Sequence, residues 1–160
     1  MKTLALAVFI LATVHCFAQD LQCLSPSRFY IPAYKANWFK ATEHCNSLGM
    51  RLAVITTAED NFHIIEAIKS SSIYNETRTQ VWIAGSDLAQ KGEFIWQPTG
   101  TWFSYTRWMP GQPDNAGGIE HCTEIRHIPA LDVHWLWNDL YCADLHNFVC
   151  ENAAPRRVVP

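Results

Sequence analysis

This chain is most informative in two short stretches, QPDNAGGIEHC at residues 112–122 and WNDLYC at residues 137–142. Together they carry five side chains whose oxygen atoms suit a metal ion, three of them carboxylates and two of them amides: Gln112, Asp114, Glu120, Asn138 and Asp139. Calcium takes about six to eight oxygen ligands and mixes carboxylates, amide and backbone carbonyls and water. The three carboxylates give this set a charge of about −3 at neutral pH. The two stretches therefore predict a calcium site.

Several motifs, in this order and at this spacing, resemble the C-type lectin domain family of secreted, calcium-dependent sugar binders. They are VWIAG at residues 81–85, QPD at residues 112–114, Glu120 two residues before Cys122, WND at residues 137–139 and FVCE at residues 148–151. The resemblance runs from about residue 29 to residue 151. It implies an α+β domain with the C-type lectin fold, made of two helices, short antiparallel sheets and a long calcium-binding loop.

The local pattern predicts two helices followed by short strands. Asn37 is a typical N-cap for a helix that ends at Leu48, before Gly49. Thr56 and Glu59 form a capping-box signature for a second helix, which ends near residue 69. The expected inward-facing residues are Trp38, Ala41, Cys45 and Leu48 in the first helix, and Phe62, Ile65 and Ile68 in the second. Strands are expected at residues 28–34, 52–55, 81–84, 93–97, 122–126, 135–137 and 148–151, with a long turn-rich loop at residues 98–118.

The first 18 residues have the pattern of a secretory signal peptide. Lys2 precedes an apolar run from Leu4 to Val14, and small residues, Cys16 and Ala18, stand at the −3 and −1 positions before the expected cleavage site. The apolar run is much shorter than the roughly 20 residues of a membrane-spanning helix. We therefore expect a secreted protein without membrane insertion. Its segments are a signal peptide at residues 1–18, an N-terminal segment at 19–27, a carbohydrate-recognition domain at 28–152 and a tail at 153–160.

Composition places the chain among ordinary single domains. It has 160 residues, 49% of them apolar, and a net charge of −3, which becomes −4 without Lys2. This mild acidity gives no electrostatic footprint for nucleic acid. The seven histidines lack the HExxH spacing of a zinc protease, and there is no GxSxG motif. We expect no enzymatic activity.

Secretion permits disulfide bonds, and five of the six cysteines lie beyond the expected signal peptide. The family resemblance implies two pairs, Cys45 with Cys150 and Cys122 with Cys142. Cys23 is then left over, which suggests either an intermolecular bridge, and thus a disulfide-linked dimer, or a capped thiol. Cleavage after residue 12 is a third option, because it would keep Cys16 as a local partner for Cys23.

The same five side chains are expected to bind sugar. A calcium ion with free coordination positions accepts two vicinal hydroxyls, to which amides donate and from which carboxylates accept hydrogen bonds. In the family, the order of Gln112 and Asp114 implies galactose-type specificity, and Pro113 implies a cis peptide bond, which is inexpensive only before proline. The alternative for these residues is a plain surface turn.

Galactose-type members usually place a tryptophan soon after this tripeptide, but residues 115–118 contain no aromatic side chain. The segment before Trp137 is longer than usual. We hypothesise that it supplies the missing sugar contact through His134 or Trp135. The alternative is that Trp135 packs inward.

A second, auxiliary calcium site of the family looks degraded here. Asp87 matches one of its ligands, but Lys91, Asn115 and His121 stand where acidic residues would help. We therefore predict one calcium ion per domain. His121 either sharpens the release of calcium in acid or is a solvated surface histidine.

The expected partners are glycans on microbial or host surfaces, most of all those with terminal galactose-type sugars, which suggests a role in innate recognition. Asn75 begins the sequon Asn75-Glu76-Thr77 and is the expected glycosylation site. Single sites of this kind bind weakly, so a multivalent form such as a Cys23-linked dimer would be favourable. The competing function is a lectin-like domain that binds a protein partner rather than sugar.

Overall fold

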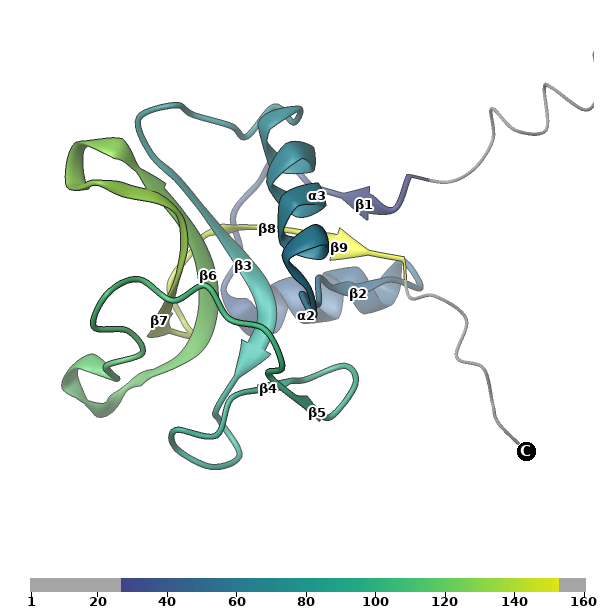
Figure 1. Ribbon diagram of the computed structural model, residues 1–160. Coiled ribbons are helices and arrows are strands. Elements are labelled where there is room, and N and C mark those ends of the chain that lie inside the picture. Colours follow the sequence, from purple (N-terminus) through teal and green to yellow (C-terminus); the bar gives the residue numbers. More distant parts are fainter. Residues whose placement is uncertain (1–26, 153–160) are drawn as a thin grey trace, which may run out of the picture.

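The computed structural model describes residues 27–152 (Figure 1). Its helices and strands follow in the order β1 (Phe29–Tyr30), α2 (Trp38–Ser47), β2 (Arg51–Leu52), α3 (Ala58–Lys69), β3 (Thr79–Ser86), β4 (Ile95–Trp96), β5 (Thr101–Trp102), β6 (Glu120–Ile128), β7 (Val133–Tyr141), β8 (Asn147–Phe148) and β9 (Cys150–Glu151). This is an α+β arrangement, as the sequence predicts. Within these residues no helix is long and apolar enough to cross a membrane.

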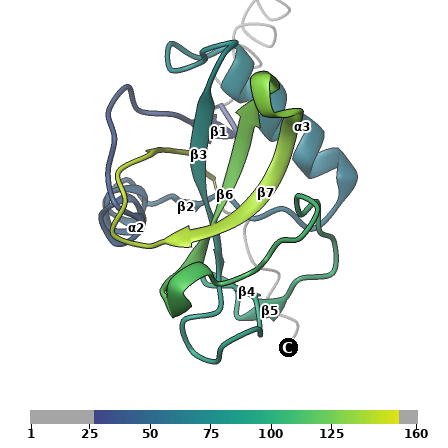
Figure 2. The ribbon, with the colours of Figure 1, turned by 90° about the vertical axis from the view of Figure 1, so that its left-hand side faces the viewer.

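The strands form two sheets. A three-stranded sheet has the order β1-β9-β2, so the first and last described strands pair with each other. A larger sheet has the order β5-β4-β3-β6-β7, and β8 joins it as a parallel partner of β3. Figure 2 shows the three long strands β3, β6 and β7 side by side, with α2 toward one side and α3 toward the other.

The strands differ in length from the prediction, and their length follows the extent of pairing with a neighbouring strand. Strands β6 and β7 are each nine residues long, whereas the sequence predicted only residues 122–126 and 135–137. Several of their outer residues are polar, such as Glu120, His121 and His134, and the cross-strand hydrogen bonds of a hairpin keep such residues in a strand without any hydrophobic pattern. The predicted first strand, by contrast, shortens to Phe29–Tyr30, where its partner β9 is available.

Both helices begin with a side-chain cap. Asn37 caps α2 by accepting from the Lys40 N–H, as predicted, and Gly49 follows with φ 69°. In α3 the cap is Thr57 rather than Thr56, and its hydroxyl accepts from the Asp60 N–H at 3.0 Å. The helix therefore starts one residue later than the capping-box pattern indicated.

Two of the predicted core residues lie on the surface. The side chain of Phe62 is 59% exposed, and the buried stripe of α3 consists of Asn61, Ile64, Ile65 and Ile68. These residues have the i, i+3, i+4, i+7 spacing of one helix face, and this face packs inward. Ile65 and Ile68 lie on it as predicted, whereas Phe62 lies outside it. Leu48 is exposed because it lies at the C-cap, outside the regular helix.

Two disulfide bonds confirm the predicted pairs. Cys45–Cys150 joins α2 to β9, and Cys122–Cys142 joins β6 to the chain just after β7. The second bond therefore fixes the two sequence stretches that carry the expected calcium ligands. Cys16 and Cys23 lie outside the described residues.

Candidate metal and sugar site

The loop between β5 and β6 is fastened to strand β7 by its backbone. The Trp137 N–H donates to the Arg107 carbonyl at 2.7 Å, and the Met109 N–H donates to the Trp137 carbonyl at 2.8 Å. The Trp137 side chain is fully buried, and its Nε1 donates to the Asn61 Oδ1 of α3 at 3.0 Å. Trp137 therefore connects the loop to strand β7 through its backbone and to helix α3 through its side chain.

Beyond this anchor the loop turns back toward β7. The Gln112–Pro113 peptide bond is cis, as the family resemblance implies. Asn115 follows in the left-handed region with φ 47°. The Asp114 N–H then donates to Asp139 Oδ1 at 3.2 Å, and the Asn115 N–H donates to Asp139 Oδ2 at 2.8 Å. The buried carboxylate of Asp139 therefore holds the turn in place.

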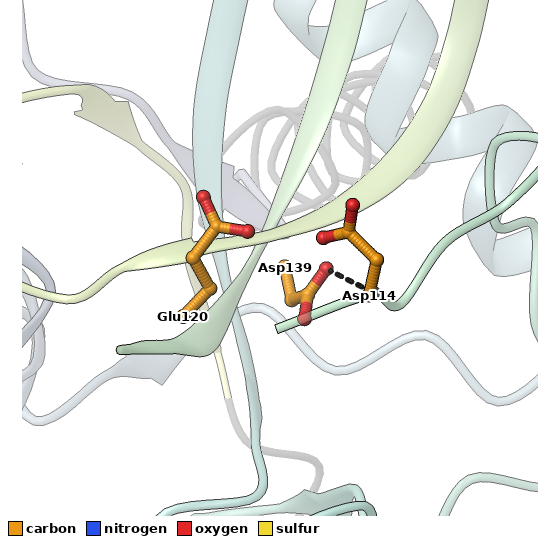
Figure 3. Close-up of side chains that lie close together, drawn as sticks. All are labelled: Asp114, Glu120 and Asp139. Atoms are coloured by element: carbon orange, nitrogen blue, oxygen red, sulfur yellow. Dashed lines mark hydrogen bonds between the residues drawn. The ribbon is translucent and has the colours of Figure 1, made fainter. Parts of the chain in front are cut away.

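Three of the five predicted ligands come together as carboxylates. Asp114 in the loop, Glu120 at the start of β6 and Asp139 on β7 each offer an oxygen atom, and these atoms all lie within 4.8 Å of one another. Figure 3 shows the three side chains reaching one space from separate segments. The Ala116 N–H holds two of them by donating to Asp114 Oδ1 and to Glu120 Oε2, both at 3.1 Å.

This arrangement concentrates negative charge. None of the three carboxylates forms an ion pair with Lys, Arg or His among residues 27–152. Burial raises the pKa of the Glu120 carboxyl, the Ala116 N–H lowers it, and the charges of Asp139 and Asp114 raise it further, with a net rise. A divalent cation would relieve this repulsion. Donor type, spacing and charge therefore fit calcium.

The side chains of the two predicted amide ligands already form hydrogen bonds within the protein. Gln112 Oε1 accepts from the Asp114 N–H at 3.0 Å. Asn138 is 3% exposed, and its Nδ2 contacts Glu124 Oε1 at 3.4 Å and the Asp139 carbonyl. Because its nitrogen faces these acceptors, the Asn138 amide oxygen points away from them and keeps its lone pairs for another partner.

Sequence reasoning missed the buried carboxylate of Glu124. It is fully buried on β6, where it contacts Arg126, Gln80 and Asn138. Burial raises its pKa, while the Arg126 charge lowers it. The available signal was its position two residues after Cys122, in a strand that otherwise faces the core.

The hypothesis of a sugar contact from the longer hairpin does not fit the structure at Trp135. This side chain is only 9% exposed and stacks on His127, with ring centroids 4.4 Å apart. The alternative in which it packs inward is therefore the observed one. His134 is exposed, but it lies near the Ile128–Val133 end of the hairpin, whereas Glu120 pairs with Tyr141 at the other end.

Asp87, the one residue that matches the family's auxiliary calcium site, is engaged in contacts within the protein. Asp87 is buried, and its Oδ1 lies 2.8 Å from His121 Nδ1, while its Oδ2 accepts from the Gly92 N–H at 2.7 Å. Lys91 and Asn115 line the adjoining cavity of about 150 Å³. Both oxygens of the one matching acidic residue are thus already used by the protein.

Comparison with known proteins agrees with this geometry. A family model described as "Lectin C-type domain" matches residues 34–152. The chain is 36% identical to "C-type lectin 16" of Aedes aegypti over 94% of its own length and 100% of that protein. It is 37% identical to "Salivary C-type lectin 1" of Aedes albopictus over 84% of its length and 88% of that protein. Among solved structures, the cow C-type carbohydrate-recognition domain of CD23, determined in the presence of GlcNAc2Man3 oligosaccharide, superposes with a TM-score of 0.63 and 29% identity, covering 79% of this chain and 87% of that one.

Proposed function

Since the chain belongs to the C-type lectin domain family, we propose that it is a secreted lectin that binds glycans through one calcium ion, with a preference for galactose-type sugars. The observation that carries the proposal is the cluster of Asp114, Glu120 and Asp139 carboxylates within 4.8 Å. These groups come from three segments, and a disulfide bond joins two of those segments. A site assembled from distant segments and stabilised in this way is suited to a ligand.

The protein's own groups have distinct roles in the proposed site. Asp114, Glu120 and Asp139 supply the charge that holds calcium, and Gln112 and Asn138 supply amide oxygens or N–H donors. A calcium ion held by these residues would offer open coordination positions for two neighbouring hydroxyls of the sugar. The ligand side chains then orient the sugar by hydrogen bonds to those hydroxyls. The amide-before-acid order of Gln112 and Asp114 supports galactose over mannose.

Residues 115–118 offer no aromatic side chain that could stack on galactose, and Trp135 is buried. Among the remaining side chains, Tyr141 is 46% exposed and pairs directly with Glu120 across β6 and β7. His134 stays a weaker candidate because of its place at the other end of the hairpin.

Secretion is supported by the signal-like residues 1–18 and by the salivary relative. An extracellular site also suits calcium, which is abundant there, and extracellular modules commonly bind it at about 10⁻⁴–10⁻³ M. We propose that the biological partners are glycans on microbial or host surfaces. Weak single-site binding favours a multivalent form.

Affinity chromatography tests the proposal. In a buffer that contains calcium, the protein should be retained on immobilised galactose more strongly than on immobilised mannose, and a chelator should elute it. Asp114→Asn should abolish retention, whereas Asp132→Asn, an equal charge change at a fully exposed position of the hairpin tip, should not. Equal retention on mannose contradicts the galactose preference alone. Retention on neither sugar favours the competing function, a protein-binding domain.

A further inference from the structure

A second polar cavity lies away from the carboxylate cluster. It measures about 80 Å³ and is lined by Lys35, Arg78, Gln80, His146 and Asn147, together with Ile73 and Thr79. These residues come from the segment before α2, the start of β3 and the start of β8. The lectin site as proposed uses none of them.

Two cations in this cavity have no carboxylate partner within residues 27–152. Arg78 Nε donates to the neutral Gln80 Oε1 at 2.8 Å, and the Lys35 side chain forms neither a hydrogen bond nor an ion pair with any described residue. In the same part of the chain, five other cations each pair with an acid: Arg28, Lys40, Arg51, Lys69 and Arg126. In an acidic chain, two unpaired cations at one cavity are a distinct local feature.

The nearby acidic groups, Glu124 and Asp144, form no ion pair with Lys35 or Arg78 among the described residues. Glu124 is fully buried and is already paired with Arg126. Burial lowers the pKa of His146 to about 4, Asp144 raises it, and Lys35, Arg126 and Arg78 lower it. Glu124 Oε2 lies 4.0 Å from His146 Nδ1. His146 is therefore neutral at physiological pH, and three cations lie close enough to influence it.

From this geometry we propose that the cavity binds a small oxyanion, sulfate or phosphate, through Lys35 Nζ and the terminal nitrogens of Arg78. A guanidinium matches two oxygens of such an anion at once, and a lysine adds a point charge. The cavity is several times larger than the roughly 10–15 Å³ that one water molecule needs on the same measure. The anion comes either as a free ion or as a substituent on a sugar.

Sulfate titration in calcium-free buffer tests the site, with calcium removed by a chelating resin so that no soluble chelator competes. Calorimetry at constant ionic strength should show saturable binding of sodium sulfate against a chloride background. Nuclear magnetic resonance should show a higher pKa of His146 in saturating sulfate, because a nearby anion stabilises the imidazolium. No saturable binding, or a pKa of His146 that does not move, contradicts the proposal.

A matched pair of double variants separates the cavity from general charge. Lys35→Gln with Arg78→Gln should weaken sulfate binding at least about tenfold. Lys40→Gln with Lys69→Gln removes the same charge from two exposed helix pairs and should leave binding unchanged. Equal losses in both double variants contradict a specific site. If the first double variant does not fold, each single substitution should still give a measurable loss.

Competition identifies the source of the anion. Galactose 6-sulfate should displace sulfate if the natural ligand is a sulfated sugar, whereas only the inorganic ions displace it if the ligand is a free anion. Unsulfated galactose should displace it in neither case. Because no calcium is present, this test succeeds or fails independently of the calcium-dependent lectin function.

Discussion

Glu124 on β6 lies directly opposite Asn138 on β7, and the Asn138 Nδ2 faces its buried carboxylate at 3.4 Å. The carboxylate is itself held by Arg126 and by Gln80 Nε2, which lies 3.1 Å from Oε2. This chain of contacts fixes which end of the Asn138 amide is free. The groups behind the proposed calcium ligands are therefore as well defined as the ligands themselves.

We expect Glu124→Gln to weaken calcium binding by about tenfold or more, because groups behind metal ligands typically change affinity by 10–100-fold. The substitution keeps the shape of the side chain but removes the charge that orders Asn138 and Arg126. Calorimetric titration with calcium measures the effect. Glu66→Gln on the exposed face of α3 is the control, and an unchanged calcium affinity in Glu124→Gln contradicts the orienting role.

Glu120→Gln should have opposite effects on stability with and without calcium. Burial and the neighbouring acids raise the Glu120 pKa, so its charge opposes folding; this cost grows as the pH rises from the unfolded pKa to the raised folded pKa and is fully present at neutral pH. The neutral variant should therefore melt at a higher temperature than the native chain when calcium is absent. It should lose most of the stabilisation by calcium, which for the native chain is about 2.7 kcal/mol at a hundred times the dissociation constant. Thermal melts at neutral pH in both conditions check this, and a lower apo melting temperature contradicts it.

Sequence patterns predicted the fold and the convergence of three carboxylates because both depend on short, ordered motifs. The cap at Asn37, the two disulfide pairs and the cis bond before Pro113 each have a local or motif-level signal, and the structure contains all of them. The carboxylates of Asp114, Glu120 and Asp139 were likewise visible as residue types at set spacing, and the fold places them together.

What the sequence could not predict depends on contacts between distant segments. In α3 the apolar Phe62 was expected to face inward, but the polar Asn61 takes that face, because its Oδ1 accepts a hydrogen bond from Trp137 Nε1 of the distant strand β7. Trp135 is of a residue type that often stacks on sugars, but in this chain its ring is buried because it stacks on His127 across the hairpin. The role of Glu124 also appears only once β6 and β7 are paired.

Asn75 should carry a glycan when the protein is secreted from a eukaryotic cell. Its side chain is exposed, and the Thr77 hydroxyl donates to its Oδ1 at 2.7 Å. Asn75→Gln and Thr77→Ala should both remove the mobility shift that an N-glycan-removing enzyme produces, and Thr77→Ser should keep it. The absence of any shift in the native chain shows that the sequon is not used.

Cys23 should form a covalent dimer if it has no partner within its own chain. We expect the secreted protein to migrate as a dimer on a non-reducing gel and as a monomer after reduction, and Cys23→Ser should be monomeric in both conditions. Ser27→Ala, a nearby substitution without a thiol, is the control. A native monomer in which Cys23 is joined to Cys16 supports cleavage after residue 12 instead, and a native monomer in which the Cys23 thiol is capped supports the capped-thiol alternative.

His146 should make the fold sensitive to mild acid. Burial lowers its pKa to about 4, compared with about 6.5 in an unfolded chain. The neutral side chain therefore contributes stability that is present above about pH 6.5 and is lost as the pH falls toward 4. The difference in pKa corresponds to at most about 3 kcal/mol.

Urea unfolding of the native chain and of His146→Gln between pH 7 and pH 4 measures this contribution. The native chain should lose stability more steeply over that range, and the two curves should run parallel below about pH 4, where His146 is protonated in both states. The glutamine keeps the backbone hydrogen bonds between residues 36 and 146, so the comparison isolates the ring. Curves that stay parallel from pH 7 downward show that the imidazole does not control the acid sensitivity.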